Sequence, residues 1–192
     1  GLTQSVALAR AGAEVYHAGA VGGDGRILLD MLKEAGADTG YVETLDGASG
    51  HAVIQIDESG QNNIIICGGT NRKITREYIS SVLEHFGKGD LILLQNEISN
   101  IDFAMEEAKK RGLQVAFNPS PADEGVFLCN LELVDYFILN EVEGRILAGT
   151  DSEEPAPILR ALREKYKNAA FVLTLGDQGA WYCDPEETSF QD

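Results

Sequence analysis

The stretch LILLQNE (91–97) holds four apolar residues followed by an abrupt change to Gln, Asn and Glu. Three later stretches repeat this pattern: VAFNPS (115–120), YFILNEVE (136–143) and FVLTLGDQG (171–179). Segments of helix length separate them. Ligands of open parallel sheets bind beyond the carboxyl ends of the strands. Polar residues that follow strand after strand therefore predict one shared site.

The segments between these runs have the spacing of amphipathic helices. Residues 75–86 place a Thr75 cap before an apolar stripe at i, i+3, i+4 and i+7, and residues 100–111 carry a similar stripe. The stripes consist of Ile79, Val82, Leu83 and Phe86, and of Ile101, Ala104, Met105 and Ala108. Further helices are expected at 2–12 and 25–36, after Asn140 and near 156–167, and a strand at 14–21. This alternation predicts an α/β fold, a mostly parallel sheet with helices on both faces.

The segment GGDGRILLDMLKEAG (22–36) is glycine-rich at its start but lacks the G-x-G-x-x-G spacing of a dinucleotide fingerprint. We interpret Asp24 as the cap of a helix over residues 25–36. Its predicted buried stripe consists of Ile27, Leu28, Met31, Leu32 and Ala35.

Residues 41–68 break the alternation, because they show no helical period. HAVIQID (51–57) and NNIIIC (62–67) flank a Glu-Ser-Gly-Gln turn, and YVETL (41–45) precedes them. This pattern predicts a small antiparallel sheet inserted into an α/β core of residues 1–40 and 69–192. The insertion is an ornament, a dimer contact or a lid over the strand-end site.

Composition narrows the classes of partner. The formal net charge of the 192 residues is −16, which repels nucleic-acid phosphates and anionic membranes. The three cysteines show neither CxxC nor Cys/His spacing, and no apolar run reaches the ~18 residues of a membrane span. We expect a reduced, cytoplasmic protein with neither nucleic acid nor membrane as partner.

Two strand ends carry carboxylates. Glu97 is suited to bind a cation, act as a base or accept hydrogen bonds from substrate hydroxyls, unless it is a surface acid or a cap. Asn140 is an expected helix cap, and Glu143 shares a helix face with it. An amide and a carboxylate at a helix N-terminus also suit phosphates held through Mg²⁺.

The turn TLGDQG (174–179) leaves a predicted buried strand. Its glycines permit close approach of a ligand to backbone N–H groups, although a simple β-turn has the same composition. The histidines at 17, 51 and 85 show no ligand or triad spacing, so hydrolase chemistry has little support.

Together these blocks resemble the ribokinase (PfkB) family of sugar kinases. GLTQSVALARAGA (1–13) resembles the family's GGKGxNQAVAxARLGA segment, and AGAVGGDG (18–25) resembles its xGxVGxD turn. The stretch from Ser49 to Asn71 is similar to the family's lid sequence and the Gly-x-Asn after it. LLQNEI, FNPSPA, ILNEVEGRILAG and TLGDQGA match further blocks in the right order.

The resemblance implies a ribokinase-like fold with a β lid and phosphorylation of a sugar hydroxyl by MgATP. It implies that Glu97 hydrogen-bonds the sugar and that Glu143 organises Mg²⁺ through water. By the same resemblance, the remaining residues expected at the sugar site are Gly1, Thr3, Ala52 and Ile54. The residues expected at the nucleotide site are Asn140, Thr174, Gly176, Asp177, Gln178 and Gly179. A monovalent cation such as K⁺ is a further possible cofactor.

Some family features are changed or missing. Thr3 stands where ribokinases usually have Asn, and Ile27 replaces a glycine of the VGxDxxG pattern. The N-terminal strand and the C-terminal DTxGAGD block, whose Asp is the family's base, are absent. We therefore expect no catalytic residue within this chain, and we expect the chain to be an inactive interior piece of a longer sugar kinase.

Several alternatives stay open. Ribose is the first candidate substrate, with another pentose, fructose or a nucleoside as competitors. A non-catalytic sugar- or nucleotide-binding module of the same fold is a second hypothesis, and an unrelated doubly wound protein such as a dehydrogenase is a third. Lids of similar kinases pack together, which predicts a homodimer through residues 41–68. The inserted sheet alternatively folds back on its own domain.

Overall fold

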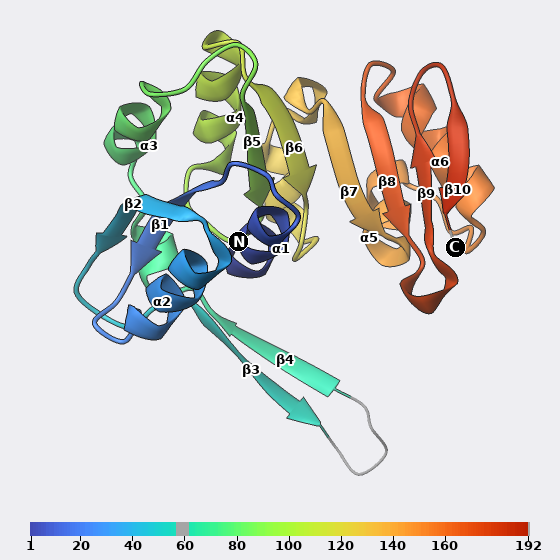
Figure 1. The fold of residues 1–192 in the computed structure, drawn as a ribbon. Coiled ribbons are helices and arrows are strands. Elements are labelled where there is room, and N and C mark those ends of the chain that lie inside the picture. The colour runs from blue at the N-terminus through green and yellow to red at the C-terminus, as the bar shows by residue number, and fades with distance from the viewer. Residues whose placement is uncertain (57–61, 192) are drawn as a thin grey trace. The chain divides into compact units, whose positions relative to one another are not determined.

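A six-stranded sheet organises the larger of two units into which the chain divides. The computed structural model describes residues 1–56 and 62–191. The first unit comprises residues 1–82 and 97–100, and the second comprises residues 83–96 and 101–192. Figure 1 labels the helices and strands of both units.

The sheet of the second unit is mostly parallel, as predicted. Its order is β10-β9-β8-β7-β6-β5, in which β5 to β8 run parallel, β9 pairs antiparallel with β8, and β10 pairs antiparallel with β9. The strands are β5 (Leu91–Gln95), β6 (Gln114–Asn118), β7 (Tyr136–Asn140), β8 (Ala170–Thr174), β9 (Ala180–Cys183) and β10 (Thr188–Gln191). Phe117, Phe137 and Phe171 are fully buried, and the rings of Phe137 and Phe171 stack at 5.5 Å. Aromatic burial on adjacent strands thus forms the centre of this core.

Three α-helices pack on this sheet: α4 (Ile101–Lys110), α5 (Glu141–Ala148) and α6 (Pro155–Lys165). Helix α4 buries Ile101, Ala104, Met105 and Ala108, which confirms the predicted stripe. Helix α6 buries Ile158, Leu159 and Leu162 in the same way. Short 3-10 turns complete the unit, namely η2 (Glu124–Leu128), η3 (Leu131–Leu133) and η4 (Gly176–Gln178).

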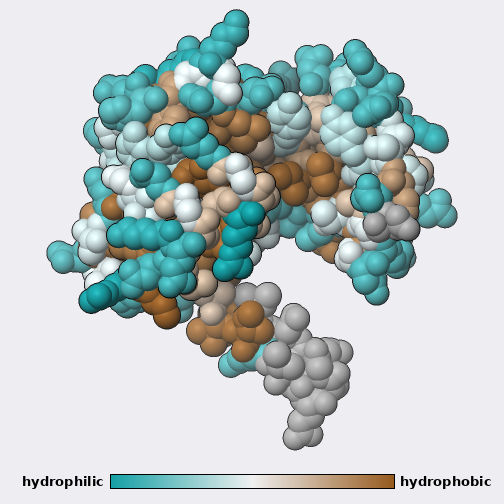
Figure 2. Space-filling model, viewed as in Figure 1, coloured by the Kyte–Doolittle hydropathy of each residue, from teal (hydrophilic) through white to brown (hydrophobic). Residues whose placement is uncertain are grey.

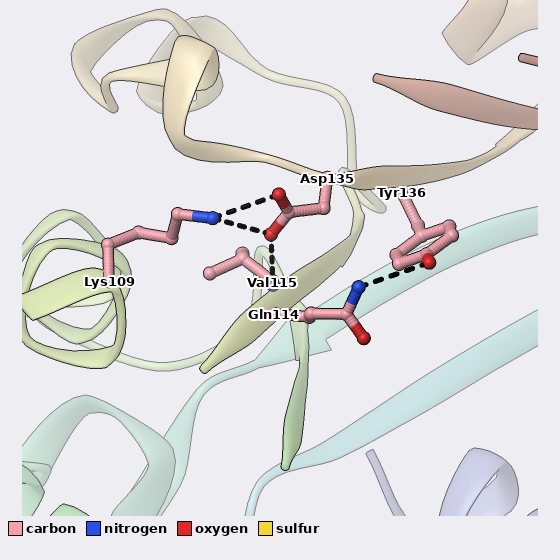
Figure 3. A network of polar contacts seen from close by, with 5 residues as sticks. All are labelled: Lys109, Gln114, Val115, Asp135 and Tyr136. Carbon is pink, nitrogen blue, oxygen red and sulfur yellow. Dashed lines mark hydrogen bonds and ion pairs between the residues drawn. The ribbon is translucent and has the colours of Figure 1, made fainter. Parts of the chain in front are cut away.

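A network of polar contacts lies at the amino-terminal ends of β6 and β7 (Figure 3). Asp135 accepts hydrogen bonds from the Val115 N–H at 2.7 Å and from Lys109 Nζ at 2.7 and 2.9 Å. Beside it, Gln114 Nε2 donates to the Tyr136 hydroxyl at 3.2 Å. Because Lys109 lies on α4, the network fastens that helix to the sheet. These hydrogen bonds satisfy the Asp135 carboxylate within the fold.

The first unit contains a parallel pair of strands, β1 (Tyr16–Val21) and β2 (Asp38–Thr44), joined by α2 (Arg26–Ala35). Helix α1 (Leu2–Arg10) packs beside α2. The prediction that residues 41–45 belong to an antiparallel sheet is therefore wrong. Helix α2 is a crossover connection that returns the chain in the direction of β1, so the second strand pairs in parallel.

The antiparallel sheet is confirmed for β3 (His51–Ile56) and β4 (Asn62–Cys67). The predicted turn at 58–61 lies outside the described residues. Ala52 pairs with Ile66, and Val53 pairs with Ile65. Successive side chains alternate between the two faces of a strand, so both faces of this hairpin carry apolar residues. Val53, Ile54, Ile65 and Ile66 are each about half exposed (48 to 58%), and Figure 2 shows apolar side chains gathered on this hairpin.

The start of α2 differs from the prediction, because Asp24 does not cap it. The helix begins after Gly25 without a side-chain cap. Asp24 Oδ1 instead accepts hydrogen bonds from the Ser49 hydroxyl at 2.7 Å and the Ser49 N–H at 2.9 Å. These bonds to Ser49 hold the pKa of Asp24 below its usual value. Asp24 therefore ties the loop after β1 to the loop before β3.

The predicted apolar stripe of α2 is only partly buried. Leu32 is 1% exposed, whereas Ile27 is 66% and Met31 45% exposed. The two-stranded sheet and helix α1 cover a narrower part of the α2 surface than a large sheet would. Ile27 and Met31, at the margins of the apolar stripe, therefore remain exposed.

The remaining elements of the first unit are η1 (Gly69–Lys73) and α3 (Arg76–Leu83), whose last residue belongs to the second unit. The predicted cap is present, because the Tyr78 N–H donates to Thr75 Oγ1 at 3.1 Å. Across the described residues, we find no helix with the length and apolar composition needed to cross a bilayer.

Candidate functional site

Four neighbouring strands of the second unit end in polar residues at one edge of the sheet. These are Gln95 on β5, Asn118 on β6, Asn140 on β7 and Thr174 on β8. Gln95 is opposite Asn118, and Asn140 is opposite Thr174, in the parallel registers of their strands. Within this unit, the predicted row of polar residues beyond the strand ends is confirmed.

Asn118 is the centre of this row. Its Nδ2 donates to the Ile138 carbonyl at 2.8 Å and to Glu143 Oε2 at 3.3 Å, and its Oδ1 accepts from Gln95 Nε2 at 2.9 Å. The sequence prediction did not assign Asn118 or Gln95 to the site. The available signal was their position as the last residue of a predicted strand.

Asn140 and Glu143 form a capping box at the start of α5. The Glu143 N–H donates to Asn140 Oδ1 at 2.8 Å, and the Asn140 N–H donates to Glu143 Oε2 at 3.0 Å. The expected capping role of Asn140 is thus confirmed. Because Asn140 is exposed, its side chain also lies within reach of a ligand at the helix N-terminus.

Glu143 is a buried carboxylate, only 5% exposed. It receives hydrogen bonds from the backbone of Asn140 and the side chain of Asn118. It also lies in the first turn of α5, where the partial positive charge of the helix end stabilises an anion. The fold thus fixes the carboxyl group of Glu143 at the edge where the strands end.

The turn after β8 contains the other predicted residues of this unit. Thr174 Oγ1 donates to the Leu139 carbonyl at 3.2 Å, which fastens β8 to β7. Gly176 has φ 60° and Gly179 has φ 95°, a conformation that favours glycine. The Leu175 N–H donates to the Gly179 carbonyl at 2.9 Å and closes the turn.

Gly176, Asp177 and Gln178 are exposed in this turn. They begin two residues after Thr174, which pairs with Asn140, so their backbone lies at the same sheet edge as the capping box. A hairpin turn and a ligand-binding loop are both compatible with this geometry.

The first unit contains the other predicted residues. Glu97 is exposed, and its Oε2 lies 3.6 Å from the amino nitrogen of Gly1. Thr3 is exposed on the first turn of α1. Ala52 and Ile54 are exposed and share one face of β3. Within this unit the structure brings Gly1 and Glu97 together.

No group of three or more His, Cys, Asp or Glu side chains is positioned to hold a metal ion among residues 1–56 and 62–191. Glu143, with the amides of Asn118 and Asn140 nearby, provides the oxygen atoms of the strand-end row that suit a hard cation.

Comparisons with known proteins agree with this geometry. Residues 1–191 match the profile described as pfkB family carbohydrate kinase. The ribokinase of Haemophilus influenzae is 29% identical over 190 residues, which is 94% of this chain and 61% of the relative. The deoxyribokinase of Salmonella typhimurium is 32% identical over 197 residues, 97% of this chain and 64% of the relative. The chain thus spans less than two thirds of the length of these relatives.

A solved structure gives the same result for the fold. The ribokinase of Cryptococcus neoformans in complex with ADP superposes with a TM-score of 0.79 at 27% identity. The match covers 100% of this chain and 66% of that protein. The predicted fold class is confirmed.

Proposed function

Because the chain belongs to the pfkB family of carbohydrate kinases, we propose that the protein transfers a phosphoryl group from ATP to a sugar hydroxyl. The observation that carries this proposal is the polar row at the carboxyl ends of β5 to β8, with Glu143 fixed at the N-terminus of α5. A helix N-terminus beside a glycine-bearing turn attracts phosphate groups.

In this proposal the nucleotide lies along the second unit. Asn140 contacts the phosphates, and the turn from Thr174 to Gly179 lines the nucleotide. Glu143 holds Mg²⁺ through bound water, which suits an ion that keeps much of its hydration shell. Magnesium, when bound, neutralises charge on the phosphates. The ADP complex of the cryptococcal ribokinase supports a nucleotide ligand for this fold.

The sugar is proposed to bind to the first unit. Glu97 accepts hydrogen bonds from sugar hydroxyls, Gly1 and Thr3 contribute the segment beside it, and Ala52 and Ile54 cover the sugar from β3. The named relatives phosphorylate ribose and deoxyribose, to judge by their names, which supports a pentose. Ribose is the first candidate. Deoxyribose is the second, because Thr3 stands where ribokinases usually have Asn and because one relative is a deoxyribokinase.

The catalytic base is proposed to lie outside this sequence. Phosphoryl transfer depends on positioning and on electrostatic stabilisation, so a chain without the base and its neighbouring helix end loses most of the rate.

The three cysteines are free, which agrees with the reducing cytoplasm as the proposed location.

A coupled ADP-release assay tests the function. We expect the full-length protein to phosphorylate a pentose with kcat in the range of roughly 1–100 s⁻¹, and the 192-residue chain alone to be at least ~10³-fold slower. EDTA should abolish the activity, because it removes Mg²⁺. Replacing KCl by choline chloride tests whether the activity requires a monovalent cation such as K⁺. Turnover per second by the chain alone would contradict its proposed inactivity. A full-length protein that binds MgATP and pentose without turnover would be a binding module instead.

We further propose that the β3–β4 hairpin forms a homodimer contact. One apolar face, with Ala52 and Ile54, serves the sugar, and the other, with Val53 and Ile65, requires a cover. Changing Ile65→Asp should convert the dimer to a monomer in sedimentation velocity, because it places a charge in the centre of an apolar contact. The control Ile146→Asp, an exposed residue of α5, should leave the dimer intact. A wild-type monomer, or a dimer that survives Ile65→Asp, would refute this contact.

A further inference from the structure

Ser5 and His17 form a polar pair inside the first unit that the proposed function does not use. Ser5 Oγ lies 2.8 Å from His17 Nδ1. Ser5 belongs to α1 and His17 to β1, and both side chains are half-buried. A hydrogen bond between helix and strand in a partly buried place fixes their relative position, because leaving either partner unpaired there has a cost.

The pair lies directly beside Gly1. The Ser5 N–H donates to the Gly1 carbonyl at 3.1 Å and closes the first turn of α1. The Cε1 atom of His17 lies 3.9 Å from the point that a Cβ at position 1 would occupy, so the imidazole lies beside Gly1. The nitrogen of that residue lies 3.6 Å from Glu97 Oε2.

The N-cap residue of α1 is Gly1, which has no side chain to cap the first turn. None of the α1 residues is fully buried. The backbone around Thr3 is held by the first turn's own hydrogen bonds and by the packing of α1 on α2 and β1, where His17 is a polar partner.

Burial lowers the pKa of His17 below its usual value. Burial thus favours the neutral form of the imidazole, which is the form that suits a hydrogen bond with the Ser5 hydroxyl. A neutral ring accepts or donates one hydrogen bond at Nδ1, depending on its tautomer. This behaviour suits a supporting group.

We propose that the Ser5–His17 pair is a positioning element for the sugar, because it holds the segment Gly1–Thr3 in place beside Glu97. This inference rests on the proposed function and deepens it. The pair does not touch the sugar in this proposal. It acts through the backbone that carries Thr3, so its loss weakens sugar binding and spares the nucleotide.

The test uses the full-length protein with the changes Ser5→Ala and His17→Phe. We expect each to raise the KM for the pentose about five- to tenfold, the size of one lost hydrogen bond, with kcat and the KM for MgATP within about twofold of wild type. Ser5→Thr keeps the hydroxyl and should restore the sugar KM. The double variant should be no worse than either single one, because both remove the same bond. His85→Phe, at an exposed histidine, is the matched control.

The outcomes separate the two proposals. A wild-type protein that neither phosphorylates nor binds a pentose, the latter by calorimetry, overturns the proposed function together with this inference. An active wild type whose Ser5→Ala variant has an unchanged sugar KM overturns the inference alone. Equal losses in the KM for sugar and for MgATP also overturn it, because they indicate general loosening of the fold. If His17→Phe does not fold, Ser5→Ala, which deletes a single oxygen, decides.

Discussion

Changing Glu143→Gln in the full-length protein is expected to lower kcat about a hundredfold, an effect of the size seen when one electrostatic contact to a transition state is lost. Gln keeps the shape of Glu and one oxygen that can accept from the Asn140 N–H. The free energy of unfolding should therefore change by only about 1 kcal/mol. The lost charge, in contrast, weakens the hold on Mg²⁺. The measurements are kcat at saturating sugar and MgATP, its dependence on free Mg²⁺, and urea unfolding.

The chain offers a matched control in the same turn of the same helix. Glu141 is exposed, whereas Glu143 is 5% exposed. Glu141→Gln removes an identical charge two residues away, and it should change kcat by less than about twofold, because an exposed charge is screened by solvent. If both variants lose activity equally, the role of Glu143 is not specific. If Glu143→Gln is fully active, the carboxylate serves only the capping box.

The second large effect is expected at Glu97. Glu97→Gln should raise the KM for the pentose roughly ten- to thirtyfold, because a hydrogen bond to a charged group contributes about 1.5–3 kcal/mol. The KM for MgATP should stay unchanged, because the nucleotide is proposed to bind to the other unit. Initial rates over a matrix of sugar and MgATP concentrations separate the two constants.

Glu34→Gln is the control for Glu97, since Glu34 is an exposed acid of the same unit. It should leave both KM values unchanged. An unchanged sugar KM in Glu97→Gln would show that Glu97 is the surface acid that its exposure also permits. The sugar site would then have to be sought elsewhere in the first unit.

Where one face of an element meets a large core, the sequence predicted the structure well. The stripe of α4 from Ile101 to Ala108 is buried as expected. Apolar residues that recur about every 3.6 positions lie on one side of a helix, and a broad sheet can cover that side. The cap at Asn140 was equally predictable, because it depends on residues three positions apart. Local spacing sufficed in both cases.

The misses depend on contacts between distant segments. Asp24 bonds Ser49 instead of its own helix, and nothing near Asp24 in the sequence indicates that partner. The pairing of β2 with β1 follows from the path of the chain through α2, whereas the composition of residues 41–45 suits either direction.

The candidate site shows the same contrast between residues that local sequence predicts and residues whose contacts depend on distant segments. Asn140, Glu143 and Thr174 follow apolar strands and were predicted from that position. Gln95 and Asn118 also end apolar runs, but the contact between them emerges only from the register of β5 against β6, which brings their amides to 2.9 Å. The Ser5–His17 pair likewise requires the packing of α1 on β1, and the spacing of the histidines gave no sign of it.

Hydrogen–deuterium exchange of the full-length protein with and without MgADP tests most directly whether the carboxyl-end edge holds the nucleotide. Peptides covering 138–146 and 172–180 should become protected, whereas peptides covering 112–117 and 133–137, at the edge closed by Lys109 and Asp135, should not change. Protection confined to the Lys109–Asp135 edge would contradict the assignment of the site, as would an unchanged pattern in a protein saturated with MgADP.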